Sequence, residues 1–126
     1  MAELHLTPAQ CELVRSLLRQ RLPAGSRVRV FGSRATGLGL KPHSDLDLLI
    51  DAPDELPLSI VGDLREALAE SALPFSVDLL QARDASEGFL AKANQLGMIE
   101  LLGAANPQGA QLPSGSRSLT PNRDIA

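Results

Sequence analysis

The sequence contains few aromatic residues and a single cysteine. Its 126 residues include three Phe, no Trp and no Tyr. Proteins that bind single-stranded nucleic acid stack the bases on aromatic side chains, so this composition argues against that class. The one cysteine, Cys11, excludes an internal disulfide and fits a reducing compartment. Cys11 is spaced along a helix with Val14 and Leu18, which predicts a buried thiol.

An excess of positive charge and long apolar runs are absent as well. The formal net charge is −3, whereas nucleic-acid-binding proteins usually carry a basic surface. The first residues include Glu3 and lack the basic start and apolar run of a signal peptide. No apolar segment approaches the roughly 18 residues that a membrane-spanning helix requires. We therefore expect a soluble cytoplasmic protein that binds neither membranes nor nucleic acid.

Two kinds of apolar periodicity predict the secondary structure. Helical spacing predicts helices over residues 8–22, 58–71 and 84–102, with capping boxes that begin at Thr7 and Asp84. Alternation predicts strands over residues 27–31, 45–51 and 75–80. Strands interspersed with helices indicate the α/β (α+β) class, in the form of a small two-layer domain with a short mixed sheet flanked by helices.

The composition changes at residue 103. Residues 103–126 are dense in Gly, Pro, Ser and Asn, with only isolated apolar residues. Such a segment cannot bury enough apolar surface to offset the entropy that is lost on ordering. We expect one folded domain over residues 1–102 and a flexible or disordered tail over residues 103–126, with ordering of the tail on a partner as the alternative.

Two aspartates lie two positions apart on the strand predicted for residues 45–51. Asp45 and Asp47 share one face of that strand, with their Cα atoms about 6–7 Å apart. Two carboxylates at this separation repel by about 2–3 kcal/mol at an effective dielectric constant near 20. A divalent cation removes that repulsion, and Mg²⁺ commonly binds one or two carboxylates together with substrate phosphates. Without burial, the same pair is an ordinary solvated strand face.

A third aspartate, Asp78, lies on the strand predicted for residues 75–80. Its neighbours Val77 and Leu79 point to the opposite face, and burying an unpartnered charge among apolar residues is costly. If this strand lies beside residues 45–51, three carboxylates converge, which is enough to hold two metal ions next to an attacking hydroxyl. The alternative for Asp78 is a salt bridge to Arg27 or Arg29.

The stretch "FGSRATG", residues 31–37, follows a predicted strand and has the chemistry of a phosphate-binding loop. Gly32 allows close approach of the backbone to a ligand. Ser33 offers its hydroxyl and backbone N–H to phosphate oxygens, and Arg34 offers a positive charge. The Walker loop and the G-x-G-x-x-G fingerprint are both absent.

In combination, "FGSRATG…SDLDLLI" and the later "VDLL" resemble the minimal nucleotidyltransferase (MNT) domain of the DNA polymerase β superfamily. That pattern consists of a G-S loop, a D-x-D or D-x-E strand and a third acidic strand, and the resemblance covers about residues 24–100. Thr36 stands where many members of the family carry a second arginine. The resemblance implies that a nucleoside triphosphate binds at Gly32, Ser33 and Arg34, and that two Mg²⁺ ions are held by the catalytic carboxylates Asp45, Asp47 and Asp78. Asp78 would also activate the acceptor hydroxyl.

Stand-alone proteins of this kind are similar to antitoxins that are paired with HEPN-domain ribonuclease toxins. This likeness implies transfer of AMP from ATP to a tyrosine of a HEPN-type partner. Two alternatives remain open. The chain could be a catalytically silent binding module that occludes its partner, or a small-molecule nucleotidyltransferase of the aminoglycoside type whose acceptor site is completed by dimerisation. Either transferase needs all three aspartates, whereas the binding module does not.

Overall fold

The computed structural model describes residues 4–103, so the predicted tail lies outside the described residues except for Gly103. Within this range, no helix is both long and apolar enough to cross a membrane. The elements, in chain order, are α1 (Pro8–Arg21), β1 (Arg27–Phe31), α2 (Ser33–Thr36), β2 (Leu46–Asp51), α3 (Leu58–Ala69), β3 (Val77–Gln81), the short 3₁₀ helix η1 (Ala82–Asp84), α4 (Glu87–Leu96) and β4 (Ile99–Leu102).

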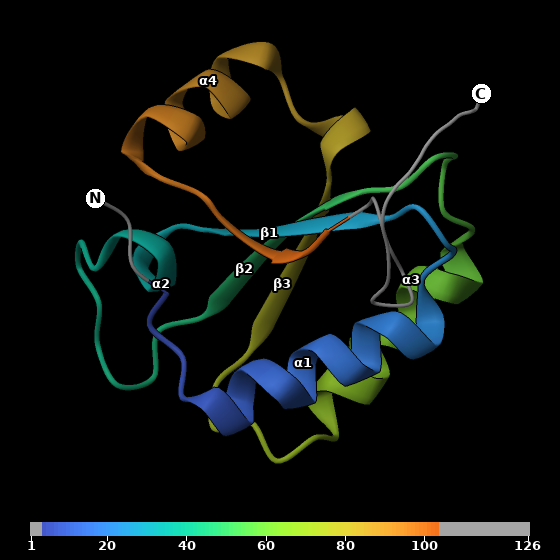
Figure 1. Ribbon diagram of the computed structural model, residues 1–126, viewed down its shortest axis with the longest axis horizontal. Helices are drawn as coiled ribbons and strands as arrows, with labels where there is room; N and C mark the ends of the chain where they lie inside the picture. The colour runs from blue at the N-terminus through green and yellow to red at the C-terminus, as the bar shows by residue number, and fades with distance from the viewer. Residues whose placement is uncertain (1–3, 104–126) are drawn as a thin grey trace, which may run out of the picture.

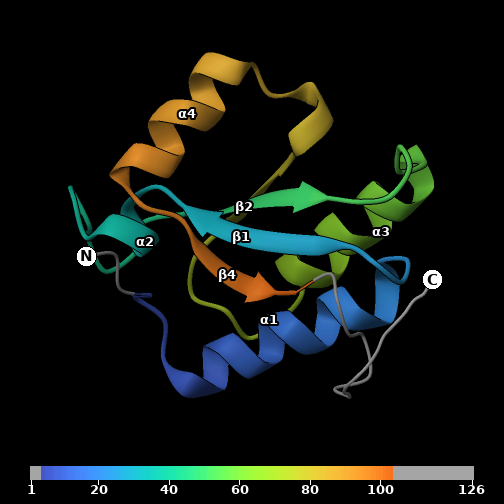
Figure 2. The same cartoon turned by 45° about the horizontal axis from the view of Figure 1, so that its top comes forward.

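The four strands form one mixed sheet in the order β3-β2-β1-β4. β1 runs antiparallel to both β2 and β4, whereas β2 and β3 are parallel. Helices α1 and α3 cover one face of the sheet, and α4 lies over the other face (Figures 1 and 2). The predicted α/β class and the mixed sheet flanked by helices are therefore confirmed.

Alternation along the two central strands decides which side chains face each layer. Val28 and Val30 of β1 are fully buried in the same core cluster as Val14 and Leu18 of α1. From β2, the core takes Leu46, Leu48 and Ile50. Because side chains alternate along a strand, Asp47 points to the opposite face, where α4 covers only part of the sheet (Figure 2).

The first helix begins as the sequence predicts. The Thr7 hydroxyl accepts a hydrogen bond from the Gln10 backbone N–H, and the Gln10 side chain accepts one from the Thr7 N–H. This capping box satisfies two N–H groups that a helix start would otherwise leave unpaired. Cys11 lies in the core, as expected.

The C-terminal part of the domain differs from the prediction. The cap of α4 is Ser86, whose hydroxyl accepts from the Phe89 N–H, whereas Asp84 lies in η1. The helix ends at Leu96 because Gly97 adopts a φ of +123°, which favours glycine. The helix predicted over residues 84–102 is therefore present only over Glu87–Leu96, and residues 99–102 form instead a fourth strand that pairs with the free edge of β1.

Candidate active site

The sheet register places two of the three aspartates side by side. Asp47 of β2 is aligned with Asp78 of β3, and the carboxylate of Asp78 is close enough to help raise the pKa of Asp47. Asp45 lies one residue before β2, and it adds to the negative charge around Asp47. Asp47 is half-buried, whereas Asp45 and Asp78 are exposed. The three carboxylates therefore form an open acidic cluster at one end of the two parallel strands.

Asp47 is electrostatically the most perturbed of the three aspartates. Burial raises its pKa to about 6, with further contributions from the nearby carboxylates of Asp78 and Asp45. A carboxylate that burial and like charges disfavour is typical of a site that functions with a cation or a proton nearby.

Gly32 forms the wall of the site next to Asp47. Phe31 is aligned with Asp47 across the β1–β2 pair, so the next residue of the chain turns past the carboxylate. Gly32 has a φ of +76°, and a Cβ atom at this position would overlap the Asp47 Oδ2 atom. Only glycine leaves this carboxylate in place, which gives a physical reason for the glycine of the G-S loop.

Arg34 lies on α2 and is directed into the protein. Its side chain is buried, and its guanidinium donates hydrogen bonds to the backbone carbonyls of Ser44, His5 and Pro42 at 3.0, 2.9 and 3.1 Å. It also lies over the Phe75 ring, 3.9 Å from the centroid. Burial lowers the pKa of Arg34 from its usual value.

These contacts give Arg34 a positioning role. The sequence suggests that Arg34 assists phosphate binding, and in the structure three of its five N–H donors bind protein carbonyls. Because Ser44 immediately precedes Asp45, the bond to the Ser44 carbonyl fixes the backbone that leads into the acidic strand. Arg34 thus ties the 37–44 loop to the site.

We expect Arg34→Ala to lower the free energy of unfolding by about 2–4 kcal/mol, because three carbonyls lose a charged donor and Phe75 loses its cation. Arg34→Lys should recover little of this, since one ammonium group cannot match the planar fork. Urea unfolding followed by circular dichroism measures the change. Arg65→Ala, at an exposed position of α3, is the control and should cost no more than about 0.5 kcal/mol. An equal effect of the two substitutions would contradict the role of Arg34.

The rest of the G-S loop is held by Thr36. Its hydroxyl donates to the Gly32 carbonyl at 3.1 Å and accepts from the Leu38 N–H at 3.0 Å. Ser33 is the first residue of α2. Where many members of the family carry a second arginine, this chain therefore has a residue that braces the loop.

Gly32 and Ser33 also line a pocket of about 250 Å³ between α2 and α4. Its far wall includes Phe89 and Lys92 of α4, which no motif in the sequence marks. Phe89 packs edge-to-face on Phe31, with a centroid separation of 5.3 Å. Only three Phe residues occur in the sequence, and two of them, Phe31 and Phe89, contact each other at this pocket. The rarity of Phe was therefore the one feature of the sequence that could have drawn attention to Phe89.

The alternative considered for Asp78, a salt bridge to Arg27 or Arg29, finds no support. Arg27 pairs with Glu100, with a distance of 3.2 Å between Nε and Oε2. Among residues 4–103, the ion pairs that form do not include Asp78. The Arg29 Nε atom is buried and has no hydrogen-bond partner in the same range.

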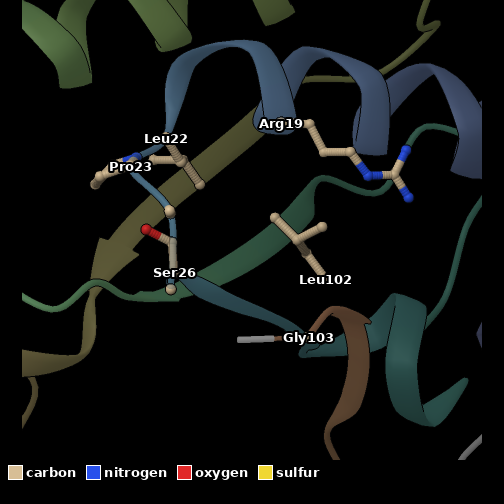
Figure 3. A pocket seen from close by; sticks show the side chains of 8 residues that line it. Arg19, Leu22, Pro23, Ser26, Leu102 and Gly103 are labelled. Carbon is tan, nitrogen blue, oxygen red and sulfur yellow. The ribbon is translucent and has the colours of Figure 1, made fainter. Parts of the chain in front are cut away.

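A second hollow, of about 200 Å³, lies where α1 ends and β1 begins (Figure 3). Ser26 contributes a buried hydroxyl that has no partner within the described part of the chain. The Arg19 guanidinium extends away from this hydroxyl (Figure 3) and approaches Glu12 at 3.8 Å. Because none of the three aspartates and no residue of the G-S loop lines this hollow, we do not assign the chemistry to it.

The donor set of the acidic cluster suits a hard divalent cation. All three groups offer carboxylate oxygens, and the pKa of Asp47 is raised first by burial and then by the charges of Asp78 and Asp45, both of which disfavour the ionised carboxylate that a bound cation would stabilise. Within residues 4–103, no three His, Cys, Asp or Glu side chains form a ready-made metal cage. Mg²⁺ does not require one, because it usually binds one or two carboxylates and completes its shell with water and phosphate oxygens. Asp45, Asp47 and Asp78 therefore fit this ion.

Comparison with known proteins gives a consistent picture. Residues 11–95 match the family model described as "Nucleotidyltransferase domain". The probable protein adenylyltransferase MntA of Haemophilus influenzae is 39% identical over 88 residues, which cover 70% of this chain and 75% of that protein.

Solved structures with the same fold include a toxin–antitoxin complex with AMP-PNP. It is 29% identical, covers 75% of this chain and 74% of its own chain, and has a TM-score of 0.61. A tri-AMPylated HEPN toxin of Shewanella oneidensis in complex with its MNT antitoxin is also similar, with 29% identity, coverage of 74% and 69%, and a TM-score of 0.55. With the family model matching most of the domain, the chain belongs to the nucleotidyltransferase domain family.

Proposed function

We propose that this chain transfers AMP from ATP to a tyrosine hydroxyl of a HEPN-type toxin and thereby acts as its antitoxin. The observation that carries the proposal is the side-by-side placement of Asp47 and Asp78 next to Gly32. The proposal is supported by relatives that are described as a protein adenylyltransferase, as a toxin–antitoxin complex with AMP-PNP and as a tri-AMPylated HEPN toxin with its antitoxin.

In this proposal, Asp45, Asp47 and Asp78 hold Mg²⁺, which when bound neutralises charge on the triphosphate and on the leaving pyrophosphate. A similar solved complex carries aspartate-to-glutamate replacements at two positions with one residue between them, which is the spacing of Asp45 and Asp47. The backbone at Gly32 and the Ser33 hydroxyl would orient the phosphates, while Arg34 keeps the loop that leads to Asp45 in place.

The chemical step is a displacement at the α-phosphorus of ATP. The tyrosine oxygen forms a bond to that phosphorus, and the bond from the phosphorus to the bridging oxygen of pyrophosphate breaks. The proton of the tyrosine hydroxyl passes to Asp78, which is exposed and faces the open side of the sheet. The products are the AMP–tyrosine ester and pyrophosphate, so positioning and charge neutralisation supply most of the catalysis.

The decisive experiment is to incubate the chain and a HEPN-type toxin with ATP and Mg²⁺, and then to measure the intact masses of both proteins. We expect the toxin to gain the mass of one or more AMP groups at tyrosine, and none when EDTA is present. Tight binding of the toxin without any transfer would contradict the enzyme and favour a silent binding module. Transfer to an aminoglycoside, with none to the toxin, would favour a small-molecule transferase.

A further inference from the structure

The G-S loop itself brings little positive charge to the place where it would hold phosphates. Under the proposed function, on which this inference rests, the triphosphate lies at Gly32 and Ser33, beside negatively charged aspartates. Arg34 lines a separate hollow of about 600 Å³, together with Lys41, and is not among the residues that line the pocket between α2 and α4. Thr36 is neutral, and its hydroxyl already braces the loop. A cation for the phosphates therefore has to come from another element.

Lys92 of α4 is the cationic side chain in the lining of the pocket to which Gly32 and Ser33 belong. It is exposed and, within residues 4–103, forms no ion pair that would engage its ammonium group. An ammonium group is a compact charge with three rotatable donors, which suits the oxygens of a phosphate. Of the two lysines in the sequence, Lys92 is thus the one beside the phosphate-binding loop, whereas Lys41 lines the other hollow.

The packing of α4 holds Lys92 opposite the G-S loop. Phe89 packs edge-to-face on Phe31, the residue that directly precedes Gly32. Residues three and four positions apart lie on the same side of a helix, so this contact also turns Lys92 and the buried Ala93 toward the loop. The ring contact therefore fixes the position along α4 at which the lysine meets the pocket.

We propose that Lys92 is a nucleotide-binding residue that donates hydrogen bonds to the two terminal phosphates of ATP, which leave as pyrophosphate. The α-phosphorus has to lie at the acidic cluster, where the tyrosine oxygen attacks it. The pocket begins at Gly32, which lies against the Asp47 carboxylate, and extends to α4, so Lys92 meets the phosphates beyond the α-phosphorus. Its charge then stabilises the pyrophosphate as the bond to the α-phosphorus breaks.

The test is the affinity for Mg²⁺-ATP, measured by isothermal titration calorimetry without an acceptor protein. We expect Lys92→Gln to weaken this binding about tenfold, because one charge-assisted contact is lost. Lys92→Arg keeps the charge and should stay within about threefold of the parent chain. Lys41→Gln is the matched control, since it removes the same charge from the other hollow, and it should stay within about twofold.

Two further readouts separate a phosphate contact from a structural role of Lys92. Added KCl should weaken ATP binding less steeply in Lys92→Gln than in the parent chain or in Lys41→Gln, because one screened charge contact is missing. Pyrophosphate and AMP are compared as competitors of ATP in the presence of Mg²⁺. Pyrophosphate should lose about tenfold in affinity for Lys92→Gln, whereas AMP, which lacks the two terminal phosphates, should change by less than about twofold.

An unchanged affinity of Lys92→Gln for ATP would overturn this assignment, even if the parent chain adenylylates the toxin. An equal loss for AMP and for ATP would overturn it as well, because Lys92 would then act on the nucleoside or on the α-phosphate. If the parent chain binds ATP through Lys92 but transfers nothing to a HEPN-type toxin, the proposed function fails and the role of Lys92 stands. Failure of the parent chain to bind ATP would overturn both.

Discussion

Asp47→Asn should reduce adenylylation by at least about 10³-fold, because it removes the charge of the central carboxylate of the acidic cluster, which lies between Asp45 and Asp78. Asparagine has nearly the same shape, so the neighbouring Gly32 and Asp78 keep their places while the negative charge is lost. The rate of AMP transfer to the HEPN-type toxin under single-turnover conditions measures the loss. A residual rate within tenfold of the parent chain would mean that Asp47 is not part of the catalytic machinery.

Asp51→Asn is the matched control for this substitution. Asp51 lies on the same strand as Asp47, four residues later, and its side chain is on the same face. It is exposed at the end of β2. Its partner across the sheet is Arg27, at the end of the sheet away from the G-S loop. We expect transfer by Asp51→Asn to stay within about twofold, so that loss of one negative charge on this face is separated from loss of the site.

The stability of Asp47→Asn provides a second readout that excludes unfolding as the cause. The pKa of Asp47 is raised from 3.8 to about 6 in the folded protein, so the folded state binds this proton more tightly than the unfolded chain. The proton's contribution to stability is complete below pH 4 and is lost as the pH rises through about 6. With EDTA at pH 7.5, we therefore expect Asp47→Asn to be more stable than the parent chain by about 1–2 kcal/mol, allowing for solvent around this half-buried group. The advantage should disappear near pH 4.

The aspartates could be found in the sequence because a strand alternates with a period of two. That period alone places Asp45 and Asp47 on one face, and it places Asp78 opposite its apolar neighbours. It does not determine which strands are adjacent. The alignment of Asp47 with Asp78 depends on the parallel pairing of β2 and β3, whose connection runs through α3. The resemblance to nucleotidyltransferases supplied what periodicity could not.

Two other features lay beyond local patterns. From the sequence alone, Arg34 is expected to be an exposed cation in a loop. In the structure its guanidinium donates to carbonyls of His5 and of residues 42 and 44, and these groups surround it only once the chain is folded. Residues 99–102 form a short apolar run that continues the composition of α4, and such runs are compatible with helix or strand. Gly97 and the unpaired edge of β1 decide in favour of the strand.

Gly32→Ala should reduce AMP transfer by at least about 10²-fold, because a misplacement of about 1 Å at a reacting centre costs that much. The new Cβ atom would overlap the Asp47 Oδ2 atom, and the flexible carboxylate is the group that must move. The backbone at Gly32, with a φ of +76° and a ψ of −156°, lies in a region that is essentially restricted to glycine, so we also expect a loss of about 1–3 kcal/mol in stability.

Gly39→Ala separates these two effects. Gly39 also has a positive φ, +70°, but a Cβ atom there would meet nothing within 4 Å. It should therefore cost about 1–2 kcal/mol of stability from the backbone alone, with transfer within about twofold of the parent chain. Both variants are assayed at a temperature where circular dichroism shows them folded, with single-turnover transfer to the toxin as the readout. Equal transfer by the two variants would show that the G-S loop glycine serves only the turn. A loss confined to Gly32→Ala would mean that glycine is required at position 32 because the Asp47 carboxylate occupies the space of a side chain.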